Sequence, residues 1–372
     1  MSYQVLARRW RPLTFEAVVG QGPIVRTLQN ALARQRIAHA YLFTGPRGVG
    51  KTTTARLLAM GLNCDRAGAG GAVPCAACDP CREIIAGRAL DVIEIDGASN
   101  RGIDEVRTLR ENVRYAPARA RRKVYIIDEV HMLTEPAFNA LLKTLEEPPP
   151  HVVFILATTE PREVPATILS RCQRFDFRPI ASGEIAAGLA RILGEEATRT
   201  GETLSVEPEA LGLIASAAEG SLRDALSLLD TALAYGEGRV AAQTVRELLG
   251  SGGAEAPWAL ASALARRDAG AALGRIDRAA AEGLDVGLLC QDAMELLRRA
   301  LLVTVHGEAP RGVTADEAER LRQLGAAGTE DLLLLVKGLL DAEVEMRKSP
   351  HPRVDLEVAV VRLCQRPDAQ AI

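Results

Sequence analysis

The feature that most constrains this chain is a glycine-rich stretch between a short apolar segment and a helical pattern. Residues 45–52 read Gly-Pro-Arg-Gly-Val-Gly-Lys-Thr, which fits the pattern G-x-x-x-x-G-K-[ST]. The apolar segment Ala40–Phe43 precedes this stretch, and the helical pattern Thr53–Leu62 follows it. Such a loop must pass from a strand into the N-terminus of a helix, so the sequence predicts an α/β domain that binds a nucleotide.

Short apolar segments alternate with helical patterns between residues 40 and 180, as a parallel sheet flanked by helices requires. Their apolar positions are nearly continuous, which indicates strands covered on both faces. The predicted strands are Ala40–Phe43, Asp91–Ile95, Val124–Ile127, Val152–Ala157 and Arg174–Phe177. A crossover helix is predicted between the third and fourth strands, where apolar residues recur at helical spacing and a proline run follows, at Phe138, Leu141, Leu142, Leu145 and Pro148 to Pro150.

The residue types of the loop suit a phosphate group. Glycines let backbone N–H groups wrap around phosphate oxygens, and the helix N-terminus adds partial positive charge. Lys51 would neutralise the β- and γ-phosphates, and Thr52 would hold Mg²⁺. The predicted contacts of this loop with ATP are Gly45, Pro46, Arg47, Gly48, Val49, Gly50, Lys51, Thr52 and Thr53.

The predicted strand Val124–Ile127 is followed by two carboxylates, Asp128 and Glu129. Open parallel sheets bind ligands at the edge where their strands end. Asp128 would complete the Mg²⁺ site with Thr52, and Glu129 would polarise the attacking water. A strand that ends in Asp-Glu is also a common surface feature, and its pairing with the phosphate loop is what favours catalysis. We expect ATP hydrolysis, with Lys51, Asp128 and Glu129 in the catalytic site.

Four of the seven cysteines form the pattern C-x10-C-x2-C-x2-C, at Cys64, Cys75, Cys78 and Cys81. Four thiolates at this spacing predict a closed structural metal site, because a catalytic zinc keeps one position open. Thiolates also bind iron–sulfur clusters, and this spacing partly fits that of ferredoxins, so it leaves the metal open. Four unliganded cysteines are the alternative.

Three domains are expected, because 372 residues exceed what one core usually contains. The predicted divisions are 1–179 for the α/β domain with the cysteine module 64–81, 180–242 for a small helical lid domain, and 243–372 for an all-α domain. Strand signals stop after Pro179, and a glycine-rich linker follows at 250–253.

Hydropathy and net charge bear on where the protein is located and on what it can bind. No run reaches the roughly 18 apolar residues of a membrane-spanning helix, and the first residues lack an apolar leader, so we expect a cytoplasmic protein without membrane contacts. The net charge is only −3, which leaves any contact with nucleic acid to a local basic patch.

Three further motifs resemble one family. The runs Tyr3–Pro12, Val18–Gln21 and Asp128–Leu133 resemble the gamma/tau subunits of bacterial DNA polymerase III, which are AAA+ clamp-loader ATPases. The resemblance covers essentially the whole chain. It implies that ATP drives loading of a ring-shaped sliding clamp onto primer–template DNA during replication, within a DNA-directed DNA polymerase complex that is a nucleotidyltransferase. It also implies zinc as the metal of the four cysteines.

The resemblance also implies roles for residues outside the loop. Thr158 matches a sensor of the γ-phosphate, Arg223 matches a second sensor in the lid, and Arg171, within Ser170-Arg171-Cys172, matches an arginine finger that reaches the ATP of a neighbouring subunit. Ala7, Arg8, Pro12 and Val19 are implied nucleotide contacts.

Each of these three sensor and finger residues has a plainer interpretation. Thr158 could simply begin a turn. Arg223 lies in the first turn of a helix that begins with a capping box, Ser221 to Asp224, and could be a solvated charge. Arginines make up 40 of the 45 basic residues, so Arg171 stands out only through its neighbours.

A basic helix face is predicted at Arg107, Arg110 and Arg114. Such a face is more often only solvated, and the acidic residues beside it dilute its charge. The resemblance implies that Arg101 and Arg107 contact DNA phosphates without reading bases.

The implied partners are the delta and delta-prime subunits, the sliding clamp (beta subunit), primer–template DNA and further copies of the chain. Those copies would assemble through a collar formed by residues 243–372. The apolar face of that domain could equally cover only its own chain.

Three other functions are alternatives. The delta-prime subunit lacks a working phosphate loop, so the intact Gly45–Thr52 argues against it. A branch-migration helicase has comparable ATP motifs, and the cysteine cluster argues against that class. A scaffold that binds ATP only structurally is the third. The chain ends shortly after Cys364, which predicts either the short gamma form or a truncated tau.

Overall fold

The computed structural model describes residues 4–67, 73–99, 111–201, 203–249, 255–307 and 315–365. Two compact units are present, Met1–Val245 and Arg246–Ile372. The predicted DNA contacts Arg101 and Arg107 lie outside the described residues. Among the described residues, no helix is both long enough and apolar enough to span a bilayer.

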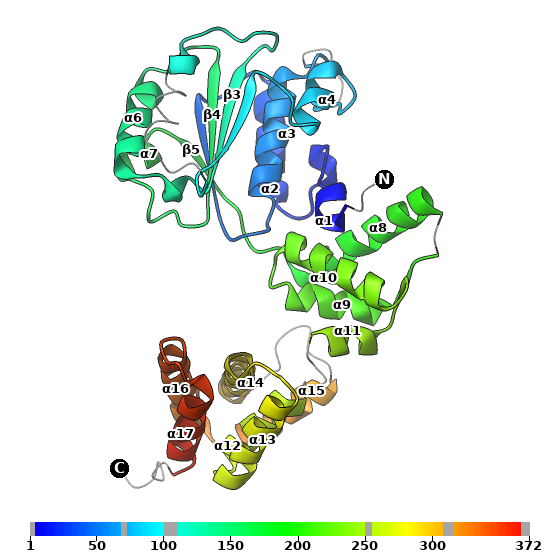
Figure 1. Cartoon of the computed structure of the whole chain (residues 1–372), viewed down its shortest axis with the longest axis vertical. Helices are drawn as coiled ribbons and strands as arrows, with labels where there is room; N and C mark the ends of the chain where they lie inside the picture. The colour runs from blue at the N-terminus through cyan, green and yellow to red at the C-terminus, as the bar shows by residue number, and fades with distance from the viewer. Residues whose placement is uncertain are drawn as a thin grey trace. The chain divides into compact units, whose positions relative to one another are not determined.

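The first unit is built on a five-stranded parallel sheet with the order β2-β3-β4-β1-β5 (Figure 1). Its strands are β1 Ala40–Thr44, β2 Val92–Asp96, β3 Lys123–Asp128, β4 Val152–Thr158 and β5 Gln173–Asp176. The three inner strands are buried almost throughout, whereas the edge strands β2 and β5 are partly exposed. The predicted parallel sheet is confirmed, and its burial on both faces holds for the inner strands.

Helices cover both faces of this sheet (Figure 1). On one face, α2 Gly22–Ala33 and α3 Lys51–Asn63 pack on strand residues such as Phe43 and Ile155. On the other face, α6 Glu135–Glu146 and α7 Ala166–Leu169 pack on alternate strand residues such as Leu42. The two cores follow from the alternation of side chains along a strand. The sheet is therefore packed on both faces, and the loops that follow its parallel strands lie at one edge.

Three short helices belong to the same unit as the sheet. They are α1 Leu6–Arg9 and η1 Phe15–Ala17 before the sheet, and α4 Asp79–Ile85, which lies beside α3. A further 3-10 turn, η2 Val130–Met132, links β3 to α6. The chain thus reaches α6 within a few residues of the end of β3.

The chain beyond β5 is mainly helical, with α8 Ser182–Thr200, α9 Pro208–Ala217, α10 Leu222–Tyr235 and α11 Ala242–Leu248. Ser221 caps α10 as predicted, since the Asp224 N–H donates to Ser221 Oγ at 3.2 Å, which is one of the two bonds of a capping box. The prediction that strands stop after Pro179 is wrong, because β6 Ser205–Val206 and β7 Arg239–Val240 form a parallel pair. Two-residue strands are too short to leave a periodic pattern.

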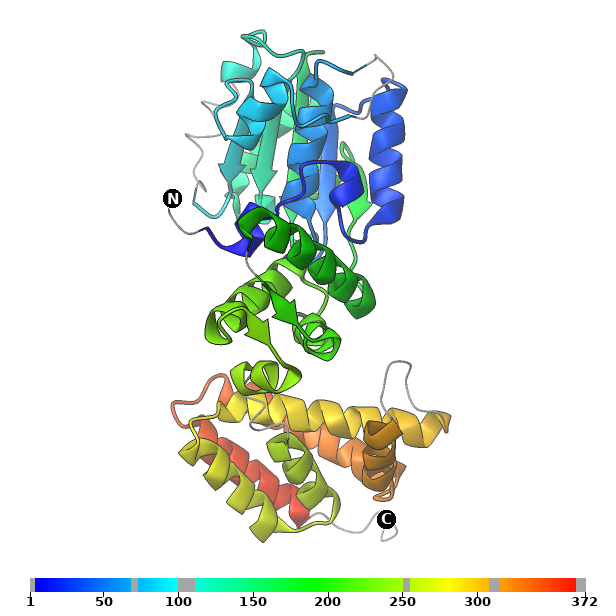
Figure 2. The same cartoon turned by 90° about the vertical axis from the view of Figure 1, so that its right-hand side faces the viewer.

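The second unit is all-α, as predicted. Its helices are α12 Glu255–Ala265, α13 Ala269–Ala281, α14 Val286–His306, α15 Ala315–Gly325, α16 Thr329–Met346 and α17 Pro352–Cys364 (Figure 2). They share one core, to which α14 contributes Leu297 and α16 contributes Leu335 and Leu339.

Candidate functional site

The loop between β1 and α3 is shaped by glycines in conformations that other residues rarely adopt. Gly45, Gly48 and Gly50 have φ angles of +140°, +76° and +100°. A Cβ on Gly45 would lie 2.4 Å from the carbonyl oxygen of Phe177, and one on Gly48 would lie 1.8 Å from Ser221 Oγ. Both contacts exclude a larger residue, and the second brings the loop against the first residues of α10.

Lys51 is the first residue of α3 and is only 6% exposed. Its Nζ donates to the carbonyl oxygens of Gly45 and Pro46, at 2.7 Å each. Burial lowers the pKa of Lys51, while the carboxylates of Glu129 and Asp128 act in the opposite direction. The loop thus holds a buried ammonium group within its curve, where a polyphosphate could use its charge.

The two predicted magnesium ligands touch. Thr52 Oγ1 donates to Asp128 Oδ2 at 2.6 Å, which joins the start of α3 to the end of β3. A hydroxyl and a carboxylate are the oxygen ligands that Mg²⁺ takes beside a bound phosphate, so this pair fits the ion.

Glu129 follows β3 with a φ of +47°. Its Oε2 accepts from the N–H of Thr159 at 3.3 Å and from the hydroxyl of Thr159 at 3.1 Å. His131 Nδ1 lies 3.5 Å from the same oxygen and 3.0 Å from Thr158 Oγ1. His131 therefore lies between the carboxylate of Glu129 and the hydroxyl of Thr158. These two residues lie at the ends of the neighbouring strands β3 and β4.

Sequence reasoning missed His131 and Thr159. His131 lies two residues after Glu129, inside the run that resembles the family, and Thr159 directly follows Thr158. Their closeness to these predicted residues is the only sequence feature that indicates a role.

A cavity of about 920 Å³ extends from the loop to the N-terminal segment and the helical domain of the first unit. It brings together most of the predicted nucleotide contacts, namely Ala7, Arg8, Pro12, Val19, Arg47–Thr53, Asp128, Glu129 and Arg223. Gly45, Pro46, Thr158 and Arg171 are not among the residues that line it. The cavity is large enough for a nucleotide.

Arg11 also lines this cavity and was not predicted. Burial lowers its pKa, and the nearby cations Arg56 and Arg223 act in the same direction, while Glu94 and Asp128 oppose them. Arg56 is itself paired with Glu94 through two bonds of 2.7 Å. Arg11 and Arg223 therefore add positive charge to the cavity, and Arg223 lies close to Gly48 of the loop. The only sequence signal for Arg11 was its place in the N-terminal run.

The N-terminal segment is fixed to the helical domain through Glu196 of α8, which is only 5% exposed. Trp10 Nε1 donates to Glu196 Oε2 at 2.8 Å, and both Arg9 and Arg199 pair with the same carboxylate. Hydrogen bonds from Arg199 and then Trp10, with the charge of Arg9, hold the pKa of Glu196 below its usual range. This contact positions the wall formed by Ala7, Arg8 and Arg11.

Arg171 lies at the surface, outside the cavity of its own chain. Its Nη1 donates to the carbonyl oxygen of Thr167 at 2.7 Å and its Nη2 to Glu146 Oε1 at 2.8 Å. The adjacent Cys172 packs against the core beneath α6, and burial raises the pKa of its thiol to about 11. The cysteine thus anchors the segment, and the arginine makes its contacts outside the cavity.

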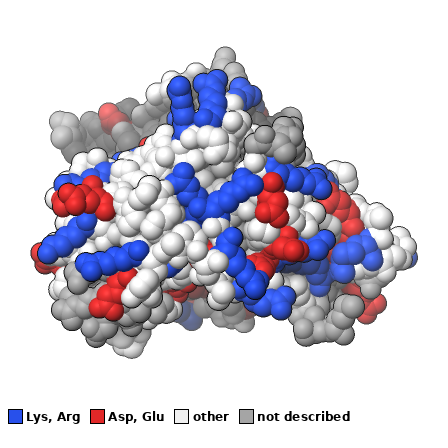
Figure 3. Space-filling view, turned by 90° about the horizontal axis from the view of Figure 1, so that it is seen from above, with Lys and Arg blue, Asp and Glu red and all other residues white. Residues whose placement is uncertain are grey.

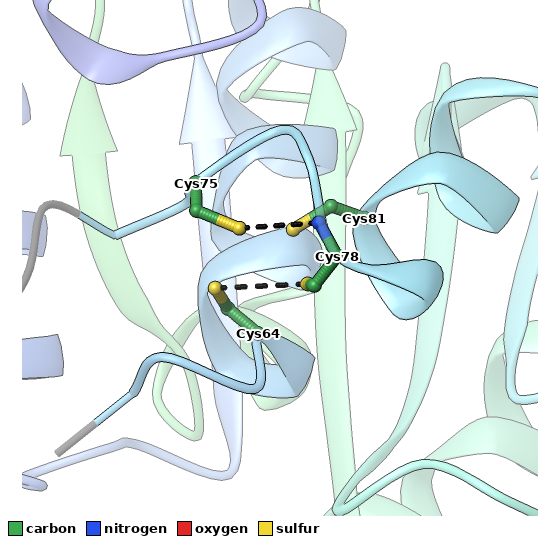
Figure 4. Close-up of side chains that lie close together, drawn as sticks. All are labelled: Cys64, Cys75, Cys78 and Cys81. Atoms are coloured by element: carbon green, nitrogen blue, oxygen red, sulfur yellow. Dashed lines mark hydrogen bonds between the residues drawn. The ribbon is translucent and has the colours of Figure 1, made fainter. Parts of the chain in front are cut away.

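The four predicted metal ligands meet beside α3. Cys64 follows the end of that helix, Cys75 and Cys78 lie in the loop before α4, and Cys81 lies in α4 (Figure 4). Their Sγ atoms all lie within 4.8 Å of one another. The separation of Cys64 and Cys78 is 4.0 Å, far from the roughly 2.05 Å of a disulfide and close to the roughly 3.8 Å expected between sulfurs in a tetrahedral zinc site.

The chemistry of these sulfurs also fits a metal. Backbone N–H groups of Ala77 and Cys78 donate to Cys75 Sγ and lower its pKa to about 6, which favours the thiolate that metals bind. Within the described part of the chain, this is the one group of three or more metal-binding side chains. The arrangement is consistent with a zinc site.

Charge is mixed on the face of the molecule shown in Figure 3. Lys and Arg side chains are spread over that face, with Asp and Glu side chains among them. The described residues of this face are therefore not uniformly basic.

Comparison with known proteins gives matches along the chain. Residues 20–181 match the family described as "DNA polymerase III, delta subunit", residues 184–238 match "DNA polymerase III clamp loader subunit, ATPase lid domain", and residues 240–371 match "DNA polymerase III subunits gamma and tau domain III".

Individual relatives agree with these matches. The chain is 47% identical to DNA polymerase III subunit tau of Escherichia coli (strain K12), over 97% of this chain and 55% of that protein. It therefore spans about half the length of that tau subunit. It is 37% identical to DNA polymerase III subunit gamma of Buchnera aphidicola subsp. Acyrthosiphon pisum, over 98% of this chain and 99% of that protein.

Among solved structures, the chain is similar to the Thermotoga maritima RuvB Holliday junction branch migration motor. The TM-score is 0.46 at 20% identity, over 65% of this chain and 72% of that one.

Proposed function

The chain belongs to the gamma and tau family of DNA polymerase III subunits, and from that premise we propose that it is an ATP-hydrolysing motor subunit of a bacterial clamp loader. The observation that carries this proposal is the meeting of Lys51, Thr52, Asp128 and Glu129 at one edge of the sheet. ATP binding and hydrolysis there would drive loading of a sliding clamp onto primer–template DNA.

Each residue of this site has a distinct task in hydrolysis. Lys51 neutralises charge on the β- and γ-phosphates, and Thr52 and Asp128 hold magnesium, which screens the phosphate oxygens when bound. Glu129 orients and polarises the attacking water. We assign Thr158 as the sensor of the γ-phosphate, and its contact with His131, which also lies beside Glu129, supports this assignment. Arg223 lines the same cavity, as does Arg11.

Arg171 would act on the ATP of a neighbouring copy rather than on its own. Its position outside the cavity of its own chain supports this assignment. An arginine that approaches a transferring phosphoryl group stabilises the charge of the transition state. The nucleotide site is then half of a shared active site, and copies of the chain would assemble with delta and delta-prime subunits to complete it.

The remaining assignments follow the same family. We propose zinc for the cysteine cluster, domain boundaries at 1–179, 180–242 and 243–372, and phosphate contacts by Arg101 and Arg107.

The DNA contacts can be tested by salt dependence. If the two arginines contact DNA, replacing each with alanine should reduce the slope of log binding constant against log salt concentration by about one unit. An unchanged slope would refute their role.

The central test is the Glu129→Gln variant in the assembled complex, with clamp and primed DNA present. We expect the ATPase rate to fall by about 10²- to 10⁴-fold, because the base is lost, while ATP still binds. Glu163→Gln is the matched control, since Glu163 is an exposed carboxylate outside the site. Normal hydrolysis by Glu129→Gln would contradict the proposal, and failure of ATP to stimulate clamp loading would show that the chain only binds nucleotide.

A further inference from the structure

The guanidinium group of Arg171 is already occupied on its own chain. Nη1 donates to the carbonyl oxygen of Thr167 at 2.7 Å and to Ser170 Oγ at 3.3 Å, and Nη2 donates to Glu146 Oε1 at 2.8 Å. The first two partners lie within four residues of Arg171 and are neutral. Glu146 is the one partner that carries a charge, and it comes from a different part of the chain.

Glu146 is the last residue of α6, which packs beside α7 (Figure 1). Buried residues of α6, including Leu141 and Leu145, fix the helix on the sheet. The side chain of Glu146 is nevertheless 49% exposed and that of Arg171 is 33% exposed. The helix thus holds the carboxylate in place, while the pair itself remains open to solvent and to a competing partner.

This pairing opposes the task proposed for Arg171. A finger must bring net positive charge to a neighbour's γ-phosphate. A carboxylate 2.8 Å from the guanidinium cancels much of that charge and would bring a like charge close to the phosphate oxygens. Exposed ion pairs are weak, whereas a phosphate offers several strong acceptors. The pair is therefore one that a correctly placed nucleotide can break.

We propose that Glu146 is a latch that holds Arg171 on its own subunit until the ATP of a neighbouring subunit competes for it. This inference rests on the proposed function of Arg171 as a finger in trans. Its consequence is that Glu146 slows hydrolysis in an assembled complex that lacks clamp and DNA, because Arg171 must leave the carboxylate before it can reach a neighbour's ATP. Once clamp and DNA bring the subunits together, the phosphate displaces the carboxylate and the latch no longer matters.

The test uses chains reconstituted with delta and delta-prime subunits. Glu146→Gln keeps an oxygen that can accept from Arg171 but removes the charge, and Glu146→Ala removes both. The adjacent Glu147→Gln is the matched control, since Glu147 is exposed and caps the same helix. We expect both Glu146 variants to raise the ATPase rate without clamp and DNA by about two- to fivefold, the range that a lost exposed ion pair allows. With clamp and DNA, their rates should stay within about twofold of wild type on the same scale.

Three outcomes decide between the explanations. A lower rate for Glu146→Ala with a normal rate for Glu146→Gln would show that Glu146 positions the finger, and would overturn the latch. A rise that persists when Glu146→Gln is combined with Arg171→Ala would overturn it as well, because the effect would not pass through Arg171. If Arg171→Ala alone leaves hydrolysis unchanged, the finger itself fails, and the latch fails with it.

Discussion

The two ends of α3 carry two sites that are built in opposite ways. At its first residue, Lys51 enters the proposed nucleotide site, a cavity whose walls come from residues as distant as Ala7 and Arg223. Just beyond its last residue, Cys64 joins a cluster whose other members all follow by position 81. One helix therefore links a site gathered from the whole unit to one gathered from a short segment.

This difference separates a complete site from an incomplete one. Four sulfurs within 4.8 Å of one another can fill a tetrahedral shell and leave no position for a reacting molecule. The nucleotide site has an open cavity, and the residue proposed to finish it, Arg171, lies outside that cavity. The first should stabilise the fold of a single chain, and the second should work only between chains.

Arg171→Ala tests this comparison with the largest expected effect, a change in the rate of ATP hydrolysis. In the assembled complex, ATP hydrolysis should fall by about 10³- to 10⁵-fold, or about 4–7 kcal/mol of transition-state stabilisation. In the isolated chain the same change should have almost no effect, because no neighbour presents its finger. ATPase rates of both preparations measure this contrast.

Arg162→Ala is the control for Arg171→Ala, since Arg162 is another exposed arginine shortly before it in the sequence. Its rates should match wild type in both preparations. Equal losses for Arg171→Ala in the isolated and the assembled states would mean that the nucleotide site is complete within one chain.

Removal of one cysteine ligand should have the next largest effect. Cys81 is fully buried, and Cys81→Ser replaces a thiolate ligand with a poor one. We expect loss of bound zinc and a fall of about 3–5 kcal/mol in the free energy of unfolding, while Cys364→Ser leaves the metal content unchanged. Metal analysis and denaturant unfolding test both expectations. Low zinc in the wild-type protein would end the zinc assignment.

The elements that the sequence predicted well are those set by local rules. The loop at 45–52 and the strands β1, β3 and β4 follow from glycine positions and from apolar runs that need no distant partner. The helix after the loop begins at Lys51 rather than at the predicted Thr53, because its geometry starts at the Gly50 cap while its apolar pattern starts later. The cysteine cluster was predictable because its ligands are close in sequence.

Contacts between distant segments were not predictable. Glu196 binds Trp10 and Arg9 from far along the chain. It follows Leu189 and Ile192 on the buried face of α8, but this spacing does not identify its partners. The pair of Glu146 and Arg171 likewise joins two elements without a periodic signal. Such partners are chosen by how the elements pack, and one sequence carries no trace of that choice.

The smallest effect is expected from Glu196→Gln, because Glu196 holds the N-terminal segment that lines the nucleotide cavity. The lowered pKa of Glu196 means that its charged form is favoured in the folded state. The charged carboxylate therefore stabilises the fold at pH values above the ordinary glutamate pKa of about 4.3. This stabilisation is lost as the pH falls through the lowered pKa. At pH 7, Glu196→Gln should lower the free energy of unfolding by about 1–2 kcal/mol, since charge-assisted hydrogen bonds are lost. The difference from wild type should shrink below about pH 4.

Glu195→Gln separates this anchor from an ordinary surface pair. Glu195 is exposed and pairs with Arg191 one turn earlier, so its loss should cost at most about 0.5 kcal/mol. Because Trp10 and Arg9 line the cavity, Glu196→Gln should also weaken ATP binding, whereas Glu195→Gln should not. If the two variants behave alike in thermal unfolding and in ATP affinity, the N-terminal wall is not held by Glu196. The nucleotide site would then depend on distant segments less than its geometry indicates.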